Sequence, residues 1–156
     1  MALDRAALLF PLLAMVVVGL VSSESAAEKF QRQHVDSKSL AFNDNTYCNH
    51  MMKIRGMTKG NCKVFNTFIL ESIWKIRAIC WNKKTACKQK FFNCHMSREP
   101  LKVTECQIKG NPKDSPCKYQ TINDKKCVTV ACNGWPPLPV HFDSSKDDIC
   151  QRLPTT

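Results

Sequence analysis

Several patterns that would assign the chain to a common class of protein are missing from the sequence. No Asn-x-Ser/Thr triplet occurs, so the chain offers no acceptor for N-glycosylation. We find no internal repeat, which argues against a repeat architecture. No two cysteines stand two to four positions apart, the spacing expected of a zinc knuckle, so zinc ligation is the less favoured interpretation of the cysteines.

A hydrophobic run long enough to span a membrane is also missing. The run from Ala6 to Val21 is shorter than the ~20 residues that a spanning helix needs, and Pro11 interrupts it. It follows a short charged start and gives way to small polar residues from Ser22. This pattern predicts a secretory signal peptide over residues 1–22 and a single secreted, extracellular domain over 23–156. A membrane anchor is the competing interpretation.

Acidic residues are scarce relative to basic ones. The chain has 13 Asp and Glu residues against 23 Lys and Arg residues, which gives a formal net charge of +10. Such a surface favours a polyanionic partner, and nucleic acid, acidic glycans and anionic cell surfaces all satisfy that condition. A solvated basic surface without a specific partner is the alternative.

All ten cysteines follow the predicted cleavage site, an even number in a small secreted chain. This predicts a framework of up to five disulfides, because small secreted domains often compensate in this way for a limited hydrophobic core. Spacing alone does not give the pairing. The cysteines are Cys48, Cys62, Cys80, Cys87, Cys94, Cys106, Cys117, Cys127, Cys132 and Cys150.

Helical and strand patterns occupy different parts of the chain. Phe30 and His34 stand four positions apart, which would place both on the inward face of a helix. A Ser/Asn/Asp-rich loop follows over 36–46, and Gly56 ends the next predicted helix. Helices first and strands later predict an α+β fold. Helices are expected over 28–35, 47–55 and 71–79, and short strands separated by turns over 101–108, 117–122, 127–132 and 138–142.

The sequence offers only four histidines, and two of them have chemically suggestive neighbours. His34 follows Gln33 on the first predicted helix. His141 lies in a Pro-Val-His-Phe-Asp segment, and alternation along a strand would place it on the same face as Asp143, whose carboxylate can then select the imidazole tautomer. Taken singly, each is better explained as an ordinary surface or core histidine. The same explanation applies to His50 and His95.

Taken together, three segments resemble the pancreatic-type ribonucleases of the ribonuclease A superfamily. They are KFQRQHVDS (29–37), CNHMMKIRGMTKGNCKVFNTF (48–68) and PVHFDSS (139–145), of which the Cys-Lys-x-x-Asn-Thr-Phe signature is highly specific. The resemblance implies three helices in the N-terminal half, packed on a bent antiparallel β-sheet. The cysteine spacings follow that family's eight-cysteine ladder, which implies the disulfides Cys48–Cys106, Cys62–Cys117, Cys80–Cys132 and Cys87–Cys94.

The resemblance also implies a metal-independent endoribonuclease that needs no cofactor. His34 would act as general base and His141 as general acid, since imidazoles suit proton transfer near neutral pH. Lys63 would stand on a strand lining the cleft and stabilise charge on the phosphate. The product would be a 2′,3′-cyclic phosphate, hydrolysed in a second step. The supporting groups implied are Gln33, the Phe142 backbone amide and Asp143.

Substrate recognition is implied at further positions. Thr67 would pair with either pyrimidine, so cleavage of single-stranded RNA is expected on the 3′ side of pyrimidines. Phe91 and Asn133 stand where glutamine and glutamate are usual, which leaves the preference for the downstream base open. Other contacts with the substrate are implied for Lys29, Arg32, Asn66, Lys88 and Asn93.

Two cysteines remain outside the eight-cysteine ladder. We expect Cys127 and Cys150 to form a fifth disulfide, with residues 146–156 as a short C-terminal extension. Counting from a hairpin over 134–137 places Ser144 opposite Cys127, so the tail would have to turn back for the sulfurs to meet. Two free thiols or an intermolecular link are the alternatives.

RNA is thus the expected partner of a monomeric, secreted enzyme. A cytosolic ribonuclease inhibitor and anionic cell surfaces are further candidate partners. Two other function classes stay open, a cationic host-defence protein that acts on membranes and an angiogenin-like signalling protein, each with weak nuclease activity. Neither class explains why the sequence combines His34, Lys63, Thr67, His141 and Asp143.

Overall fold

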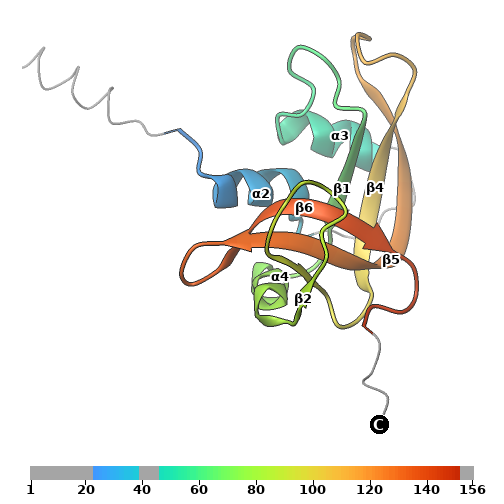
Figure 1. Cartoon of the computed structure of the whole chain (residues 1–156). Coiled ribbons are helices and arrows are strands. Elements are labelled where there is room, and N and C mark those ends of the chain that lie inside the picture. The colour runs from blue at the N-terminus through green and yellow to red at the C-terminus, as the bar shows by residue number, and fades with distance from the viewer. Residues whose placement is uncertain (1–22, 39–45, 152–156) are drawn as a thin grey trace, which may run out of the picture.

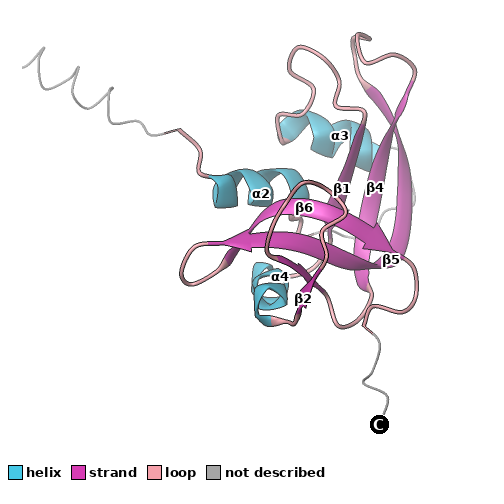
Figure 2. Ribbon diagram, viewed as in Figure 1, coloured by secondary structure: helices cyan, strands magenta, loops and turns pink. Residues whose placement is uncertain are grey.

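The computed structural model describes residues 23–38 and 46–151, so the predicted signal peptide, part of the predicted loop and the end of the C-terminal extension lie outside the described residues. Figure 2 shows short helices around strands of very different length. In chain order the elements are α2 (Ala26–His34), α3 (Thr46–Ile54), β1 (Phe65–Ile69), α4 (Ile73–Ala78), the 3₁₀ helix η1 (Ile79–Trp81), β2 (Lys84–Thr85), β3 (Cys94–Met96), β4 (Leu101–Lys109), β5 (Lys118–Asn133) and β6 (Leu138–Lys146).

Strand β5 connects the two arms of the antiparallel sheet. Its first half, up to Lys126, pairs with β4, and β1 pairs with the other edge of β4. Its second half, from Cys127, pairs with β3 on one side and β6 on the other. In Figure 1, β4 and β5 rise in one arm, while β5 and β6 run across in the other. The chain therefore has the predicted α+β fold, and its described residues form three α-helices on a bent antiparallel sheet.

Local sequence explains where α2 begins. The Ser25 hydroxyl accepts a hydrogen bond from the Glu28 backbone amide, and the Glu28 carboxylate accepts one from the Ser25 amide. This capping box satisfies amides that the first helical turn leaves without partners. The helix therefore starts two residues earlier than the predicted residue 28, while its end at His34 differs from the predicted end by one residue.

Two groups of buried side chains hold the helices on the sheet. In the first, Phe30 of α2 and Ile76 of α4 pack with Val130 of β5. In the second, Met52 of α3 packs with Tyr119 at the start of β5. Burial of each such side chain contributes about 1.5–3 kcal/mol to stability. These contacts hold α2 and α4 on one part of the sheet and α3 on the other. None of the helices among the described residues has the length and apolar composition that crossing a membrane requires.

The sequence predicted a break between Ile122 and Cys127, and this prediction was wrong. β5 continues through residues 123–126 without interruption. These residues pair with 101–104 of β4, which satisfies their backbone groups. Turn-forming side chains therefore do not end a strand where a neighbouring strand supplies the hydrogen bonds.

Strand β6 is longer than predicted, and its pairing with β5 contains two register shifts. The shifts leave Val140 and Asp143 as extra residues without a partner across the sheet. Because the two steps add, Cys127 lies opposite Lys146. The expectation that Ser144 would lie opposite Cys127 was therefore wrong by two residues.

Five disulfides crosslink the described residues. The Cys127 and Cys150 Cα atoms are 5.1 Å apart, and their sulfurs are bonded. The longer β6 carries the chain to a point opposite Cys127, and Asp148, with a positive φ of 66°, turns the tail back. The remaining four bridges join the pairs that the resemblance implied, Cys48–Cys106, Cys62–Cys117, Cys80–Cys132 and Cys87–Cys94.

Candidate active site

His34 is the last residue of α2 and is almost fully buried, with 9% of its surface exposed. Its Nδ1 atom lies 2.8 Å from the backbone oxygen of Thr67 in β1. Because a carbonyl oxygen only accepts hydrogen bonds, Nδ1 carries the proton and the neutral ring presents Nε2 as an acceptor. Burial lowers the pKa of His34 to about 4, with smaller contributions from the charges of Lys63 and His141, while the bond to Thr67 acts in the opposite direction. His34 is therefore neutral at pH 7.

His34 and His141 line the same cavity, which we call the first cavity. It has a volume of about 210 Å³ and lies between α2 and β6, with Lys29 and Gln33 in its wall. The Phe142 ring also lines it and stacks on His34 at a centroid distance of 5.2 Å. Figure 1 shows α2 lying against β6, and this packing brings the two imidazoles to one site.

The side chain of His141 is exposed and stacks on Phe91. The two ring centroids are 4.2 Å apart, and the ring planes differ by only 3°. Phe91 belongs to the loop that the Cys87–Cys94 disulfide closes. The stack therefore holds the His141 ring against this loop.

Asp143 does not hydrogen-bond to His141, contrary to the expectation from strand alternation. Asp143 is one of the two extra residues of β6, so the alternation between residues 141 and 143 is broken. Its buried carboxylate instead accepts hydrogen bonds from the backbone amides of Lys88 and Gln89, both at 2.9 Å. Asp143 therefore anchors the loop that carries Phe91.

Lys63 precedes β1 by two residues. The resemblance had implied that Lys63 stands on a strand, and the structure places it just before one. Its ammonium group donates to Oδ1 of Asn66 at 2.9 Å, and Nδ2 of Asn66 donates to the backbone oxygen of Gln33 at 2.8 Å. These two hydrogen bonds tie Lys63 to α2 beside the first cavity. Burial, followed by the charges of Lys29 and Arg32, lowers the pKa of Lys63.

Thr67 lies in the middle of β1 with 2% of its surface exposed. Its backbone oxygen holds His34, but its buried hydroxyl has no hydrogen-bond partner within the described residues. A buried polar group without a partner costs about 1–3 kcal/mol. Thr67 is not part of the wall of the first cavity, so its hydroxyl is a buried group whose hydrogen bond is left unmade within the described residues.

The three basic residues expected beside flanking phosphates have different surroundings. Lys29 lines the first cavity. Arg32 forms a two-pronged ion pair with Glu24, with N···O distances of 2.7 and 2.9 Å, so its guanidinium is already occupied. Lys88 is exposed and has no carboxylate partner among the residues that the structure describes. The structure thus brings Lys29 to the two histidines and leaves Arg32 engaged elsewhere.

Asn93 lies outside the first cavity, in a neighbouring second cavity of about 310 Å³. Asn133 is also part of its wall, whereas His34 is not. Phe91 and His141 line both cavities. Together with Val140, which also lines both, the stacked pair therefore forms the partition between them.

Sequence reasoning missed two residues that shape the site. Arg55 lies just after α3, and its guanidinium donates to the backbone oxygens of Gln31, Arg32 and Val35 at 3.2, 2.9 and 2.8 Å. These bonds satisfy carbonyls at the end of α2, the turn that carries the general-base candidate. Phe91 was noted only as a departure from the family pattern. No local pattern marks either role, because both depend on partners distant in the sequence.

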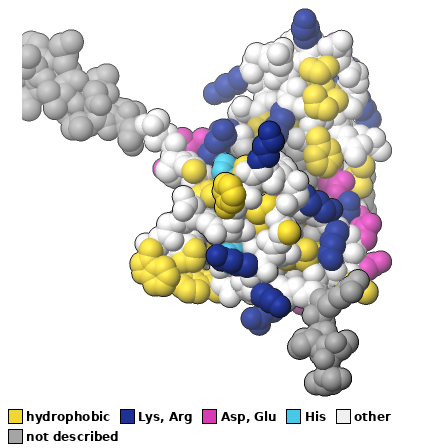
Figure 3. All heavy atoms as spheres, viewed as in Figure 1, with side chains coloured by type: hydrophobic (Ala, Val, Ile, Leu, Met, Phe, Trp, Pro, Cys, Tyr) yellow, Lys and Arg dark blue, Asp and Glu magenta, His cyan; other side chains and the backbone are white. Residues whose placement is uncertain are grey.

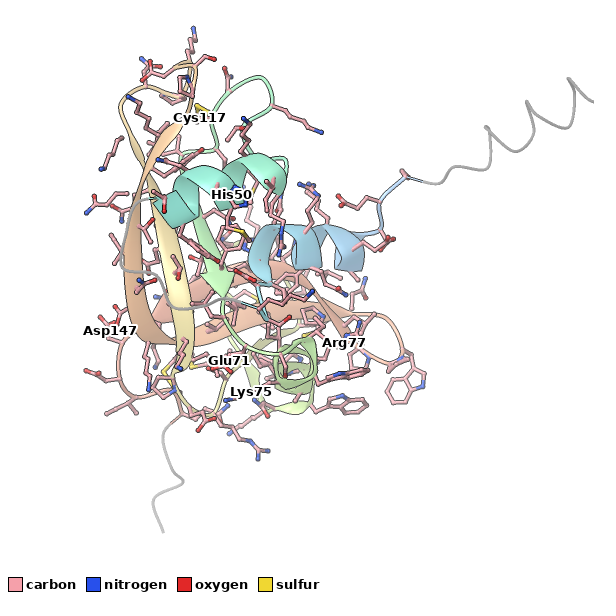
Figure 4. The ribbon with its side chains drawn as sticks, turned by 180° about the vertical axis from the view of Figure 1, so that it is seen from behind. His50, Glu71, Lys75, Arg77, Cys117 and Asp147 are labelled. Carbon is pink, nitrogen blue, oxygen red and sulfur yellow. A yellow bond between two sulfur atoms is a disulfide. The ribbon has the colours of Figure 1, made fainter. Side chains whose placement is uncertain are left out.

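The other two histidines lie away from both cavities. Nδ1 of His95 is 2.7 Å from the backbone oxygen of Asn82, which satisfies a buried ring. Figure 4 views the molecule from behind and shows His50 on α3. His50 lines a larger hollow of about 600 Å³, and that hollow contains none of the candidate catalytic residues.

Comparisons with known proteins agree with this geometry. A family model for pancreatic ribonuclease matches residues 25–143. The chain is 45% identical over 148 residues to the pancreatic ribonuclease of Acomys cahirinus, covering 93% of this chain and 99% of that protein, and 43% identical with the same coverage to that of Mus musculus. The crystal structure of green turtle egg white ribonuclease superposes with a TM-score of 0.68 at 37% identity, covering 79% of this chain and all of that one. The chain therefore belongs to the pancreatic ribonuclease family.

Proposed function

We propose that the protein is a secreted, metal-independent endoribonuclease that cleaves single-stranded RNA on the 3′ side of pyrimidines. The observation that supports this best is the meeting of His34 and His141 at one cavity, with His34 neutral and its Nδ1 proton directed to Thr67. A neutral imidazole can accept a proton while a second, protonated imidazole donates one. Cleavage of RNA through its own 2′-hydroxyl requires this pair of transfers.

In the first step, Nε2 of His34 takes the proton of the ribose 2′-hydroxyl, and the 2′-oxygen attacks the neighbouring phosphorus. The bond from phosphorus to the 5′-oxygen breaks, and protonated His141 gives its proton to that departing oxygen. The products are a 2′,3′-cyclic phosphate and a free 5′-hydroxyl. In the second step, water attacks the cyclic phosphate and the two histidines exchange roles. DNA lacks the attacking hydroxyl, so it binds without being cleaved.

Lys63 stabilises the negative charge that develops on the non-bridging phosphate oxygens. A fixed ammonium in a partly buried position acts more strongly on this charge than a solvated one. Asn66 holds that ammonium at 2.9 Å and is itself held by Gln33. The backbone amide of Phe142 supplies a further donor to the phosphate.

Thr67 selects the base upstream of the cleaved bond. Its hydroxyl can donate or accept a hydrogen bond, so it pairs with either uracil or cytosine. The absence of another partner for this buried atom within the described residues supports the assignment. Lys29 and Lys88 contact phosphates along the strand, and Asn93 contacts the downstream base.

The cellular setting follows from the sequence and the crosslinks. Residues 1–22 act as a signal peptide, and five disulfides suit an oxidising, extracellular environment. The protein acts as a monomer, and its basic surface makes cytosolic ribonuclease inhibitor and anionic cell surfaces further partners. No specific observation favours the host-defence or signalling alternative.

The test is cleavage of defined oligonucleotides by the secreted protein with EDTA present. We expect products that end in 2′,3′-cyclic phosphates after uridine and cytidine, and none from DNA of the same sequence. Loss of cleavage in EDTA, or equal cleavage after purines, would contradict the proposal.

A further inference from the structure

Three aromatic side chains beyond the active site are unusually exposed. Phe92, Trp81 and Trp135 expose 84%, 62% and 85% of their surface. Trp81 and Trp135 meet edge to face, with ring centroids 5.8 Å apart and planes at 71°. Neighbouring exposed aromatic side chains mark binding surfaces more often than isolated ones do. We call these three residues the aromatic track.

The aromatic track begins at the active site. Phe92 lines the second cavity together with Asn133 and His141. From Asn133, at the end of β5, the chain enters the β5–β6 turn and reaches Trp135 two residues later. Figure 1 shows this turn projecting beyond the sheet, and Figure 3 shows hydrophobic side chains gathered at the same place. Phe92 thus shares a cavity with His141, and the β5–β6 turn carries Trp135, which meets Trp81, onward from Asn133 in the wall of that cavity.

The position of the second cavity identifies which part of a bound strand would follow this path. In the proposed reaction His141 protonates the 5′-oxygen of the departing nucleotide. The second cavity contains His141 but not His34, so it lies on the side of the departing, downstream nucleotide. The aromatic track continues away from that side.

The charges beside the aromatic track suit a polyanion. Lys83 and Lys84 follow Trp81 in the sequence, and Lys90 lines the second cavity. In the described ranges, none of these three lysines has a carboxylate within 4.0 Å. Surfaces that bind single-stranded nucleic acid combine free cationic groups with aromatic rings on which successive bases stack.

We propose that the aromatic track binds the RNA strand downstream of the cleaved bond, with bases stacked on Phe92, Trp135 and Trp81. This inference rests on the proposed ribonuclease function and extends it from one nucleotide pair to a longer strand. The track favours substrates that extend several nucleotides to the 3′ side, whatever the sequence of that extension. An anionic membrane is the competing occupant, and the experiment includes it.

The test compares three substrates that differ only in where the strand extends. One is the dinucleotide UpA. The other two are DNA oligonucleotides of equal length with a single ribouridine, placed near the 5′ end in one and near the 3′ end in the other. Only the ribouridine can be cleaved, and the two oligonucleotides carry equal charge, so a difference between them reports the side of the extension.

The variants are Trp135→Ala and Trp81→Ala, with Trp74→Ala as the matched control. Trp74 is 73% exposed, and its ring lies under the guanidinium of Arg77, a residue of α4 that Figure 4 labels, at 5.1 Å from the ring centroid. We expect each track variant to lower kcat/KM about tenfold for the 3′-extended substrate, the effect of losing one stacked base, and to leave cleavage of UpA and of the 5′-extended substrate unchanged. Trp74→Ala should match the wild type on all three substrates.

A binding measurement separates this inference from the proposed function. An all-DNA oligonucleotide should quench the tryptophan fluorescence of the wild type, and less so that of Trp135→Ala, even if no substrate is cleaved. If the protein binds the oligonucleotide in this way but does not cleave UpA, the result contradicts the proposed function and leaves RNA binding by the aromatic track intact. Three results would each contradict RNA binding by the aromatic track. The first two are equal losses of activity on the 3′- and 5′-extended substrates, and an equal loss in Trp74→Ala. The third is a fluorescence shift with phosphatidylcholine–phosphatidylglycerol vesicles but none with the oligonucleotide.

Discussion

The backbone oxygen of Thr67 accepts the Nδ1 proton of His34 at 2.8 Å, while the hydroxyl of the same threonine has no partner within the described residues. Thr67 therefore sets the tautomer of the proposed general base and also offers the group proposed to select the pyrimidine. The proposed proton transfer and the proposed base selection would therefore both depend on one residue of β1. A change in this short segment should affect both.

Removing either imidazole should abolish most of the activity. We expect His34→Ala and His141→Ala each to lower kcat/KM for a pyrimidine dinucleotide by several orders of magnitude, because each proton transfer loses its donor or acceptor. In the wild type, activity should rise with pH as His34 loses its proton, starting near its pKa of about 4. Steady-state kinetics across pH check this, and near-normal activity in either variant would disprove the roles assigned here.

The buried, neutral His34 should also make stability depend on pH. Its pKa is about 4 in the folded chain against about 6.5 when unfolded, so between these values the unfolded chain binds more protons. The stability present above pH 6.5 should therefore fall as the pH drops to 4, by up to about 3 kcal/mol from this residue. Urea unfolding of the wild type and His34→Gln at pH 7 and pH 4 measures it. The variant should lose less stability over this range, and an equal loss in both proteins would contradict the prediction.

The charge of Lys63 should matter more than its shape. We expect Lys63→Ala to lower kcat strongly and Lys63→Arg to lower it less, because the guanidinium keeps the charge but changes the geometry at Asn66. Single-turnover kinetics on a dinucleotide separate the chemical step from binding. Equal losses in the two variants would show that geometry, not charge, decides the contribution of Lys63.

Thr67→Val should separate stability from activity. Valine keeps the shape of the side chain and the backbone bond to His34 but removes the unpartnered hydroxyl. We expect the free energy of unfolding to stay equal or to rise by about 1 kcal/mol, while cleavage after pyrimidines falls. Thermal unfolding and oligonucleotide digests provide the two measurements. A variant that is markedly less stable would show that the hydroxyl has a partner in the free protein.

The fifth disulfide should stabilise the chain without contributing to catalysis. Cys127 and Cys150 are separated by 23 positions in the sequence, and replacing both by alanine opens the loop that their disulfide closes. This change should lower the free energy of unfolding by at most about 3 kcal/mol. Activity at low temperature should persist, because the bridge lies at the end of β6 away from both cavities. Mass mapping without reduction checks the pairing, and a Cys127 peptide found alkylated would contradict it.

Local patterns predicted the elements that depend on nearby residues. The four-residue spacing of Phe30 and His34 indicated α2 and its inward face, and both side chains are buried there. Gly56, with a positive φ of 78°, stands just past the end of α3, as expected of a helix terminator. The order of helices and strands predicted the α+β class, since each of these signals acts over one or two turns of chain.

Other features were beyond local patterns because they depend on which strands become neighbours. The continuous β5 depends on β4 as its partner, and the register of β6 depends on two bulges that no residue type in the segment indicated. The bulge at Asp143 breaks the alternation between this residue and His141, and the Asp143 carboxylate accepts hydrogen bonds from the amides of Lys88 and Gln89. Strand pairing, rather than alternation along one strand, thus decided the surroundings of the candidate acid.

The sequence by itself determined which chemical groups this protein has available, namely two imidazoles, an ammonium, a threonine hydroxyl and ten cysteines at specific positions. Only the tertiary structure decided what each group contacts: Asn66 for Lys63, Phe91 for His141 and the backbone of Thr67 for His34. The physical reason is that burial and hydrogen-bond partners come from segments far apart in the chain. The pKa of His34 and the partition between the two cavities therefore arise only when α2, β1 and β6 pack together.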